Sequence, residues 1–82
     1  MIDKANYRSI EISGATTFEP DTTRNYFMVV ASGGNTDVAF GVGGANITVA
    51  AADILEPNVV PTGTVTVTPT STAIVVISGV GA

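Results

Sequence analysis

Cysteine, histidine and tryptophan are absent from this chain of 82 residues. Without cysteine there is no disulfide, and without cysteine or histidine the usual transition-metal sites lack their ligands. A catalytic serine or threonine needs a base beside it, and the chain has no histidine and only Lys4 as a lysine. The sequence therefore predicts that the protein is not an enzyme and that it binds no metal and no cofactor.

Positive charge is scarce as well. Lys4, Arg8 and Arg24 are the only cations beside seven carboxylates, and the net charge is −4. Nucleic acids and anionic membranes both attract basic surfaces, so the sequence predicts neither as a partner. No apolar run approaches the ~18 residues of a membrane-spanning helix. The first six residues are polar and no apolar segment follows them, which predicts synthesis in a cytoplasm without a signal peptide.

The chain is short for a protein without covalent or metal cross-links. Charged residues make up 12% of it, about half of the usual ~25%. Small domains with thin cores are commonly stabilised by disulfides, metals or subunit contacts, and only the last of these is open here. We therefore expect other chains to cover part of its surface, through oligomerisation or docking on a larger assembly.

The sequence shows no long segment with helical periodicity. It consists instead of short β-branched segments that are separated by glycine, proline, asparagine and aspartate. Residues 26–30 and 73–77 are uninterrupted apolar runs, typical of centrally placed strands. Residues 63–68 alternate, with Val65 and Val67 on one face and threonines on the other. About seven or eight such strands, at roughly ten-residue spacing, predict an all-β fold: a small antiparallel β-sandwich or a jelly-roll-like domain.

Two finer predictions concern connectivity. The Gly-Gly-Asn segment within residues 32–35 predicts a hairpin turn that joins a strand at 25–32 to a partner at 37–41. Residues 7–13 alternate as one half-buried strand, and a polar segment with Pro20 follows it. We therefore expect an extended N-terminal arm with one short strand over residues 1–22, and a sandwich domain over residues 23–82.

Residues 23–77 resemble small structural proteins of tailed bacteriophages. The resemblance lies in RNYFMVV at residues 24–30, NITVAAADILEP at 46–57, GTVTVT at 63–68 and the apolar strand at 73–77. Capsid decoration (cement) proteins and head-fibre bases are often acidic, cysteine-free β-domains of this kind. The resemblance implies a virion structural protein that binds the major capsid protein on the outer capsid surface. It also implies a homotrimer that stabilises neighbouring capsid subunits.

Five side chains are predicted to lie at protein contacts. Arg24 is chosen because a lone arginine can bind a carboxylate through two parallel hydrogen bonds. Tyr26 is chosen because it and Phe27 face opposite sides of one strand, so one of these rings is free to anchor an interface. The full set of predicted contact residues is Ile10, Ile12, Phe18, Arg24 and Tyr26.

Other functions stay open at this point. The second reading is a receptor- or glycan-binding module of a fibre or adhesin, which predicts exposed aromatic rings near carboxylates or amides at one tip. An enzyme is the third hypothesis, and a self-assembling filament or tail-tube subunit is a further hypothesis. Threonine stands at every second position from 62 to 70, but one such strand is ordinary outward polar patterning.

Overall fold

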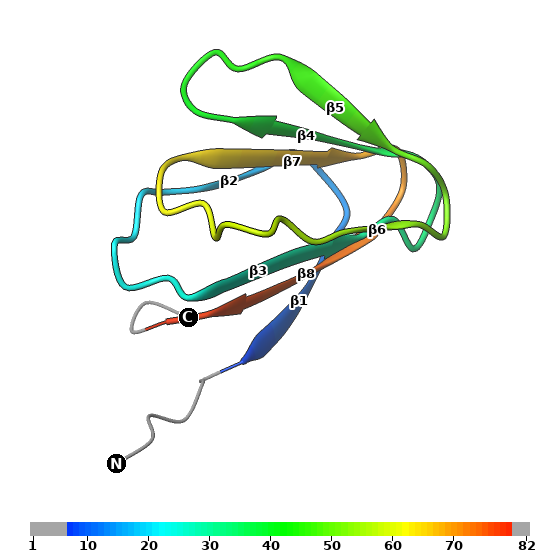
Figure 1. Ribbon diagram of the computed structural model, residues 1–82. Helices are drawn as coiled ribbons and strands as arrows, with labels where there is room; N and C mark the ends of the chain where they lie inside the picture. Colours follow the sequence, from blue (N-terminus) through cyan, green and yellow to red (C-terminus); the bar gives the residue numbers. More distant parts are fainter. Residues whose placement is uncertain (1–6, 80–82) are drawn as a thin grey trace.

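The computed structural model describes residues 7–79, and this part of the chain contains eight strands and no helix. It therefore has no helix that could cross a membrane. Figure 1 shows the strands in two layers. They are β1 (Arg8–Ile12), β2 (Thr16–Phe18), β3 (Tyr26–Val30), β4 (Thr36–Phe40), β5 (Asn46–Val49), β6 (Ile54–Leu55), β7 (Val65–Pro69) and β8 (Ala73–Ser78).

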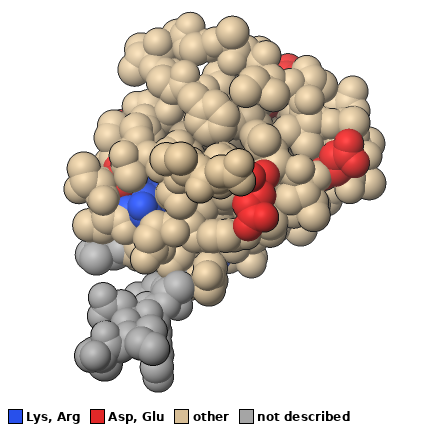
Figure 2. All heavy atoms as spheres, in the orientation of Figure 1, with Lys and Arg blue, Asp and Glu red and all other residues tan. Residues whose placement is uncertain are grey.

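The eight strands form two four-stranded sheets. The first sheet has the order β1-β8-β3-β6 and the second has the order β2-β7-β4-β5, and every neighbouring pair is antiparallel. The predicted all-β, antiparallel sandwich is confirmed. The two apolar runs form β3 and β8, which are the central strands of the first sheet, as the sequence predicted. Few charged atoms appear on the side of the molecule drawn in Figure 2.

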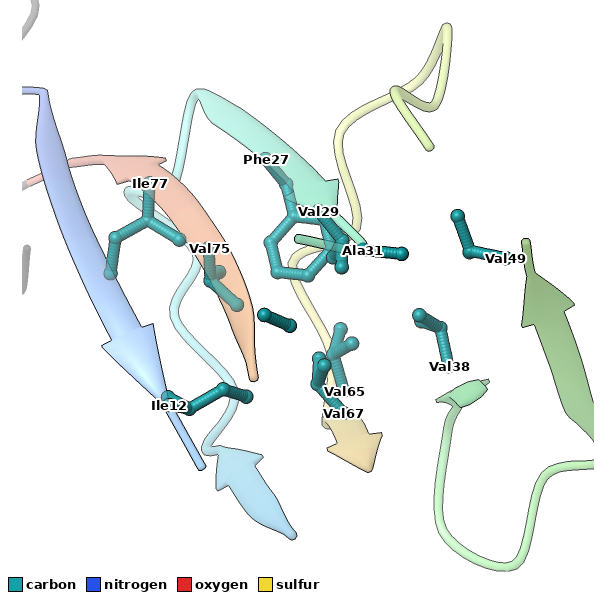
Figure 3. Close-up of a cluster of buried hydrophobic side chains, with 11 residues drawn as sticks. Ile12, Phe27, Val29, Ala31, Val38, Val49, Val65, Val67, Val75 and Ile77 are labelled. Atoms are coloured by element: carbon teal, nitrogen blue, oxygen red, sulfur yellow. The ribbon is translucent and has the colours of Figure 1, made fainter. Parts of the chain in front are cut away.

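The core lies between the two sheets. Val29 and Val75 of the first sheet have no solvent exposure, and neither have Val65 and Val67 of the second. The predicted inward direction of Val65 and Val67 is thus confirmed. The accessible surface, 4872 Å², is close to the ~4,600 Å² expected for a folded monomer of this mass. Because these four valines are fully buried, side chains of this one chain fill the space between the sheets around them. Figure 3 shows the cluster, in which Ile12, Phe27, Val29, Ala31, Val38, Val49, Val65, Val67, Val75 and Ile77 are labelled.

The predicted hairpin across residues 32–35 is wrong. β3 pairs with β6 and β8, whereas β4 pairs with β5 and β7, so the segment between β3 and β4 crosses from one sheet to the other. Backbone hydrogen bonds hold this crossing against the connection between β7 and β8: Gly33 N donates to Thr72 O at 2.9 Å, and Thr70 N donates to Asn35 O at 2.9 Å. A turn-forming motif indicates that the chain reverses, and it does not indicate in which sheet the chain continues.

An extended N-terminal arm is not confirmed. β1 is hydrogen-bonded to β8 in the first sheet, and β2 is hydrogen-bonded to β7 in the second. Ile12, at the end of β1, belongs to the core. The expected boundary between residues 1–22 and 23–82 thus separates β1 from its partner β8 and β2 from its partner β7. Residues 1–6 of the expected arm lie outside the described residues.

Candidate functional site

The outer face of the second sheet is polar. The inward residues of β7 are Val65 and Val67, so Thr66 and Thr68 point outward. Thr17 of β2 lies opposite Thr66, and their hydroxyl oxygens are 3.3 Å apart. Asp37 of β4 lies opposite Thr68 and accepts a 2.8 Å hydrogen bond from the Thr48 hydroxyl. This surface, called the threonine face below, is suited to contact with water. It comprises Thr17, Asp37, Thr48, Thr66 and Thr68.

The outer face of the first sheet is apolar. Met28 lies opposite Val76, and Val30 lies opposite Ile74, so four apolar side chains of the two central strands form one block. All four are partly exposed. Ile54 of β6 lies opposite Val30 and extends the block toward the sheet edge, with 60% of its surface exposed. We call Met28, Val30, Ile54, Ile74 and Val76 the apolar face.

Polar residues border the apolar face on both edges of the sheet. Along β1, Ser9 lies opposite Val76 and Glu11 lies opposite Ile74. On the other edge, Glu56 follows directly after β6. An apolar centre with a polar border is the arrangement that protein–protein interfaces commonly show. The geometry of this side of the molecule thus favours contact with another protein.

Two tyrosines and a carboxylate gather at one end of the first sheet. The rings of Tyr7 and Tyr26 meet edge to face, with centroids 5.2 Å apart and planes at 83°. The Tyr26 hydroxyl donates a hydrogen bond to the Glu56 carboxylate, and it lies 3.5 Å from the sulfur of Met28. The hydrogen bond to Glu56 raises the pKa of Tyr26 above 10.0, and partial burial and the negative charge of Glu56 raise it further. We call Tyr7, Tyr26 and Glu56 the Tyr–Glu corner.

Of the five predicted contact residues, the structure places only Tyr26 on this outer surface. Ile10 and Phe18 are partly buried and pack against the core, and Ile12 is 7% exposed. Phe18 meets the ring of Phe27 edge to face at 6.2 Å. The sequence correctly placed Ile10 and Ile12 on one face of a strand, but that face points inward. The outward residues of β1 are Ser9 and Glu11.

Arg24 is also an interior residue. Its Nη1 donates to the carbonyl oxygens of Pro61 at 2.7 Å and Gly63 at 3.1 Å, and its Nη2 donates to the carbonyl oxygen of Glu19 at 2.8 Å. The side chain is 7% exposed. Three backbone carbonyls of this chain thus bind the guanidinium, and the expected bidentate contact between Arg24 and a partner's carboxylate stays a prediction.

The sequence did not single out the apolar face, although it carries a signal for it. An uninterrupted apolar run is typical of a strand that is buried on both sides. In a two-layer sandwich each strand has one inner side, so the second apolar side of β3 and β8 is left at the surface. In β3 and β8 consecutive residues are apolar, whereas a strand with one buried side has an apolar residue at every second position. This difference in the hydrophobic pattern locates the apolar face.

The described residues contain no group of three or more acidic, cysteine or histidine side chains that could hold a metal ion. Comparison of the chain with protein-family models, with curated proteins and with solved structures gave no match. The two unlike outer faces and the Tyr–Glu corner are the features of the described residues that bear on function.

Proposed function

We propose that this chain is a virion structural protein: a capsid decoration (cement) protein that binds the outer surface of a bacteriophage head and stabilises neighbouring capsid subunits. The observation that carries the proposal is the apolar face. Its central residues, Met28, Val30, Ile74 and Val76, extend across two strands, and each of them is partly exposed to solvent. Extended apolar patches on small proteins commonly mark surfaces that bind other proteins. The resemblance of residues 23–77 to phage structural proteins supplies the setting.

The finer architecture that we propose is a jelly roll. In support of it, β1 pairs with β8, β2 with β7, β3 with β6 and β4 with β5. Such pairing is that of one long antiparallel ribbon folded over into two sheets. Jelly rolls occur in viral capsid proteins and in lectins. Because one fold serves many functions, the architecture supports the proposal only together with the apolar face.

The unlike outer faces give the proposed protein an orientation. The apolar face lies against the capsid shell, and the threonine face points to the solvent. Binding that favours the folded chain stabilises it by mass action, which suits a small domain without disulfides. The major capsid protein and a homotrimer remain the predicted partner and assembly. Contacts between copies in a trimer then use the sheet edges, because the apolar face is occupied by the shell.

The first test asks where the chain is located. Purified particles of the phage that carries this sequence are examined by electron microscopy with an antibody raised against the chain. We expect label on the head surface. Label confined to tails or fibres, or particles without label, contradicts the proposal.

The second test asks which face binds. Heads stripped of the protein are mixed with purified chain and sedimented. The original chain is expected to sediment with the heads, and Val76→Thr on the apolar face is expected to stay in the supernatant. The matched variant Thr68→Val on the threonine face is expected to bind like the original. Loss of binding by Thr68→Val together with retained binding by Val76→Thr contradicts the proposed orientation.

The Tyr–Glu corner favours a second candidate function, a receptor- or glycan-binding module. Sugars are often bound by aromatic rings beside carboxylates, and Tyr7, Tyr26 and Glu56 bring both together at one end of the first sheet. A glycan array separates the two candidates. A reproducible sugar signal that disappears in Tyr26→Ala supports the second candidate, and an array without signals removes it.

A further inference from the structure

We propose that the apolar face and the Tyr–Glu corner form one docking site, and that its occupant is a protein surface on which a lysine or arginine stands beside apolar side chains. The inference rests on the proposed function in taking a protein as the partner, and it adds the chemistry of that partner. It is carried by the charges around the face, by the geometry of the corner and by the size of the face.

The charges bordering the apolar face are negative. Glu11 borders it along β1, and Glu56 borders it beyond β6. Of the two arginines among residues 7–79, Arg24 is buried in the interior. Arg8 lies on β1 next to Tyr7, but it is opposite the inward-facing Ile77, so the alternation of the strand places it on the other side of the sheet from Glu11. Two copies of this chain placed face to face would bring four carboxylates together without a described cation between them. A partner that carries a cation is the complementary one.

The Tyr–Glu corner is suited to receive that cation. The face of an aromatic ring carries negative potential, which attracts an ammonium or guanidinium group. Tyr7 is 63% exposed, and its ring stands edge to face against Tyr26. Tyr26 in turn holds the Glu56 carboxylate through its hydroxyl. A cation at this corner meets a ring and a carboxylate at the same time.

The size of the face argues against a second copy as the occupant. Four strands at ~4.8 Å spacing and three outward rows at ~7 Å spacing span about 400 Å² of flat area. Stable complexes usually bury about 800 Å² on each partner. A pair of copies joined through this face alone falls well short of that area and also opposes like charges. A differently shaped partner can contact the corner and the neighbouring loops as well.

The test uses the full isotopically labelled chain and two synthetic peptides, followed by backbone and side-chain NMR shifts. The first peptide places an arginine between leucines and valines. The second replaces the arginine with citrulline, which has nearly the same shape and no charge. We expect the arginine peptide to shift signals of the corner and of Met28 and Val76. We expect the citrulline peptide to bind about fivefold more weakly, the size of an exposed cation–π contact plus a surface ion pair.

Two variants locate the effect. Glu56→Gln is expected to remove about half of the free-energy difference between the two peptides, because it removes the ion pair and leaves the cation–π contact. Asp37→Asn, a matched change on the threonine face, is expected to leave that difference intact. Equal affinity for the two peptides, shifts confined to the threonine face, or no binding at millimolar peptide would each overturn the inference. Sedimentation of the chain alone as a dimer that Ile74→Thr dissociates would assign the face to a second copy and overturn it as well.

The outcomes for this inference and for the proposed function are separable. Selective peptide binding without binding to phage heads retains the cationic docking site and removes the capsid as partner. Binding to heads with equal affinity for the two peptides retains the capsid and removes the cationic partner.

Discussion

The guanidinium carbon of Arg24 lies 6.0 Å from the centre of the Phe27 ring, the largest of the fully buried side chains. The same guanidinium binds one carbonyl in the connection between β2 and β3, at Glu19, and two in the connection between β6 and β7, at Pro61 and Gly63. Arg24 thus links two loops at one end of the sandwich to the aromatic centre of the core. This role is structural, and it leads to the first prediction.

Replacing Arg24 by alanine is expected to lower the free energy of unfolding by about 2–3 kcal/mol. The change removes hydrogen bonds from a charged donor to three carbonyls and leaves those carbonyls poorly solvated. Chemical denaturation measures the effect. Arg8→Ala, at an exposed position of β1, serves as the control and is expected to change the free energy by less than about 0.5 kcal/mol. Equal effects of the two variants would contradict the role assigned to Arg24.

In this protein the sequence predicted local properties of the strands better than contacts between residues that are far apart in the chain. The alternation of Val65 with Thr66 predicted an outward and an inward side because side-chain direction in a strand is a local property. The strand Thr16–Phe18 was not predicted, because its three residues include one apolar side chain and therefore show no hydrophobic alternation. The interior position of Arg24 was not predicted, because two of its acceptors lie 37 and 39 residues away, and they are backbone carbonyls, which any sequence contains.

The pH dependence of the Tyr–Glu corner provides a second prediction. The pKa of Tyr26 is raised above 10.0, chiefly by its hydrogen bond to Glu56. The folded chain therefore holds this proton more tightly than the unfolded chain. The resulting contribution to stability is fully present below pH 10.0 and is lost as the pH rises through the folded-state pKa. Tyrosinate absorbance against pH measures the titration, and Tyr26→Phe identifies the component that belongs to Tyr26.

Glu56→Gln is the decisive variant for this second prediction. It removes the negative charge and weakens the hydrogen bond, so the pKa of Tyr26 is expected to fall toward its ordinary value. A Tyr26 component at or below pH 10.0 in the folded original chain, or one that Glu56→Gln leaves unchanged, would show that the hydrogen bond is not formed in solution.

A third prediction concerns a hydroxyl in the core. Thr36 of β4 has no solvent exposure, and its Oγ1 has no hydrogen-bond partner. A buried hydroxyl without a partner costs about 1–3 kcal/mol. The isosteric change Thr36→Val is therefore expected to raise the free energy of unfolding by about 1 kcal/mol, measured by chemical denaturation. Thr48→Val, which removes the hydroxyl that donates to Asp37, is the control and is expected to stabilise less or to destabilise.

The last prediction separates the interior from the apolar face with two adjacent residues. Val75 and Val76 follow one another in β8; Val75 has no solvent exposure, whereas Val76 is partly exposed on the outer side. Val75→Thr places an unpartnered hydroxyl in the core and is expected to lower the free energy of unfolding by about 2 kcal/mol. Val76→Thr keeps the shape and the β-propensity and is expected to change it by less than about 0.5 kcal/mol. Because valine and threonine are nearly isosteric, the difference between the variants reports burial alone. If Val76→Thr were as destabilising as Val75→Thr, the outer side of β8 would be part of the interior of the isolated chain, and the apolar face would not be free to bind a partner.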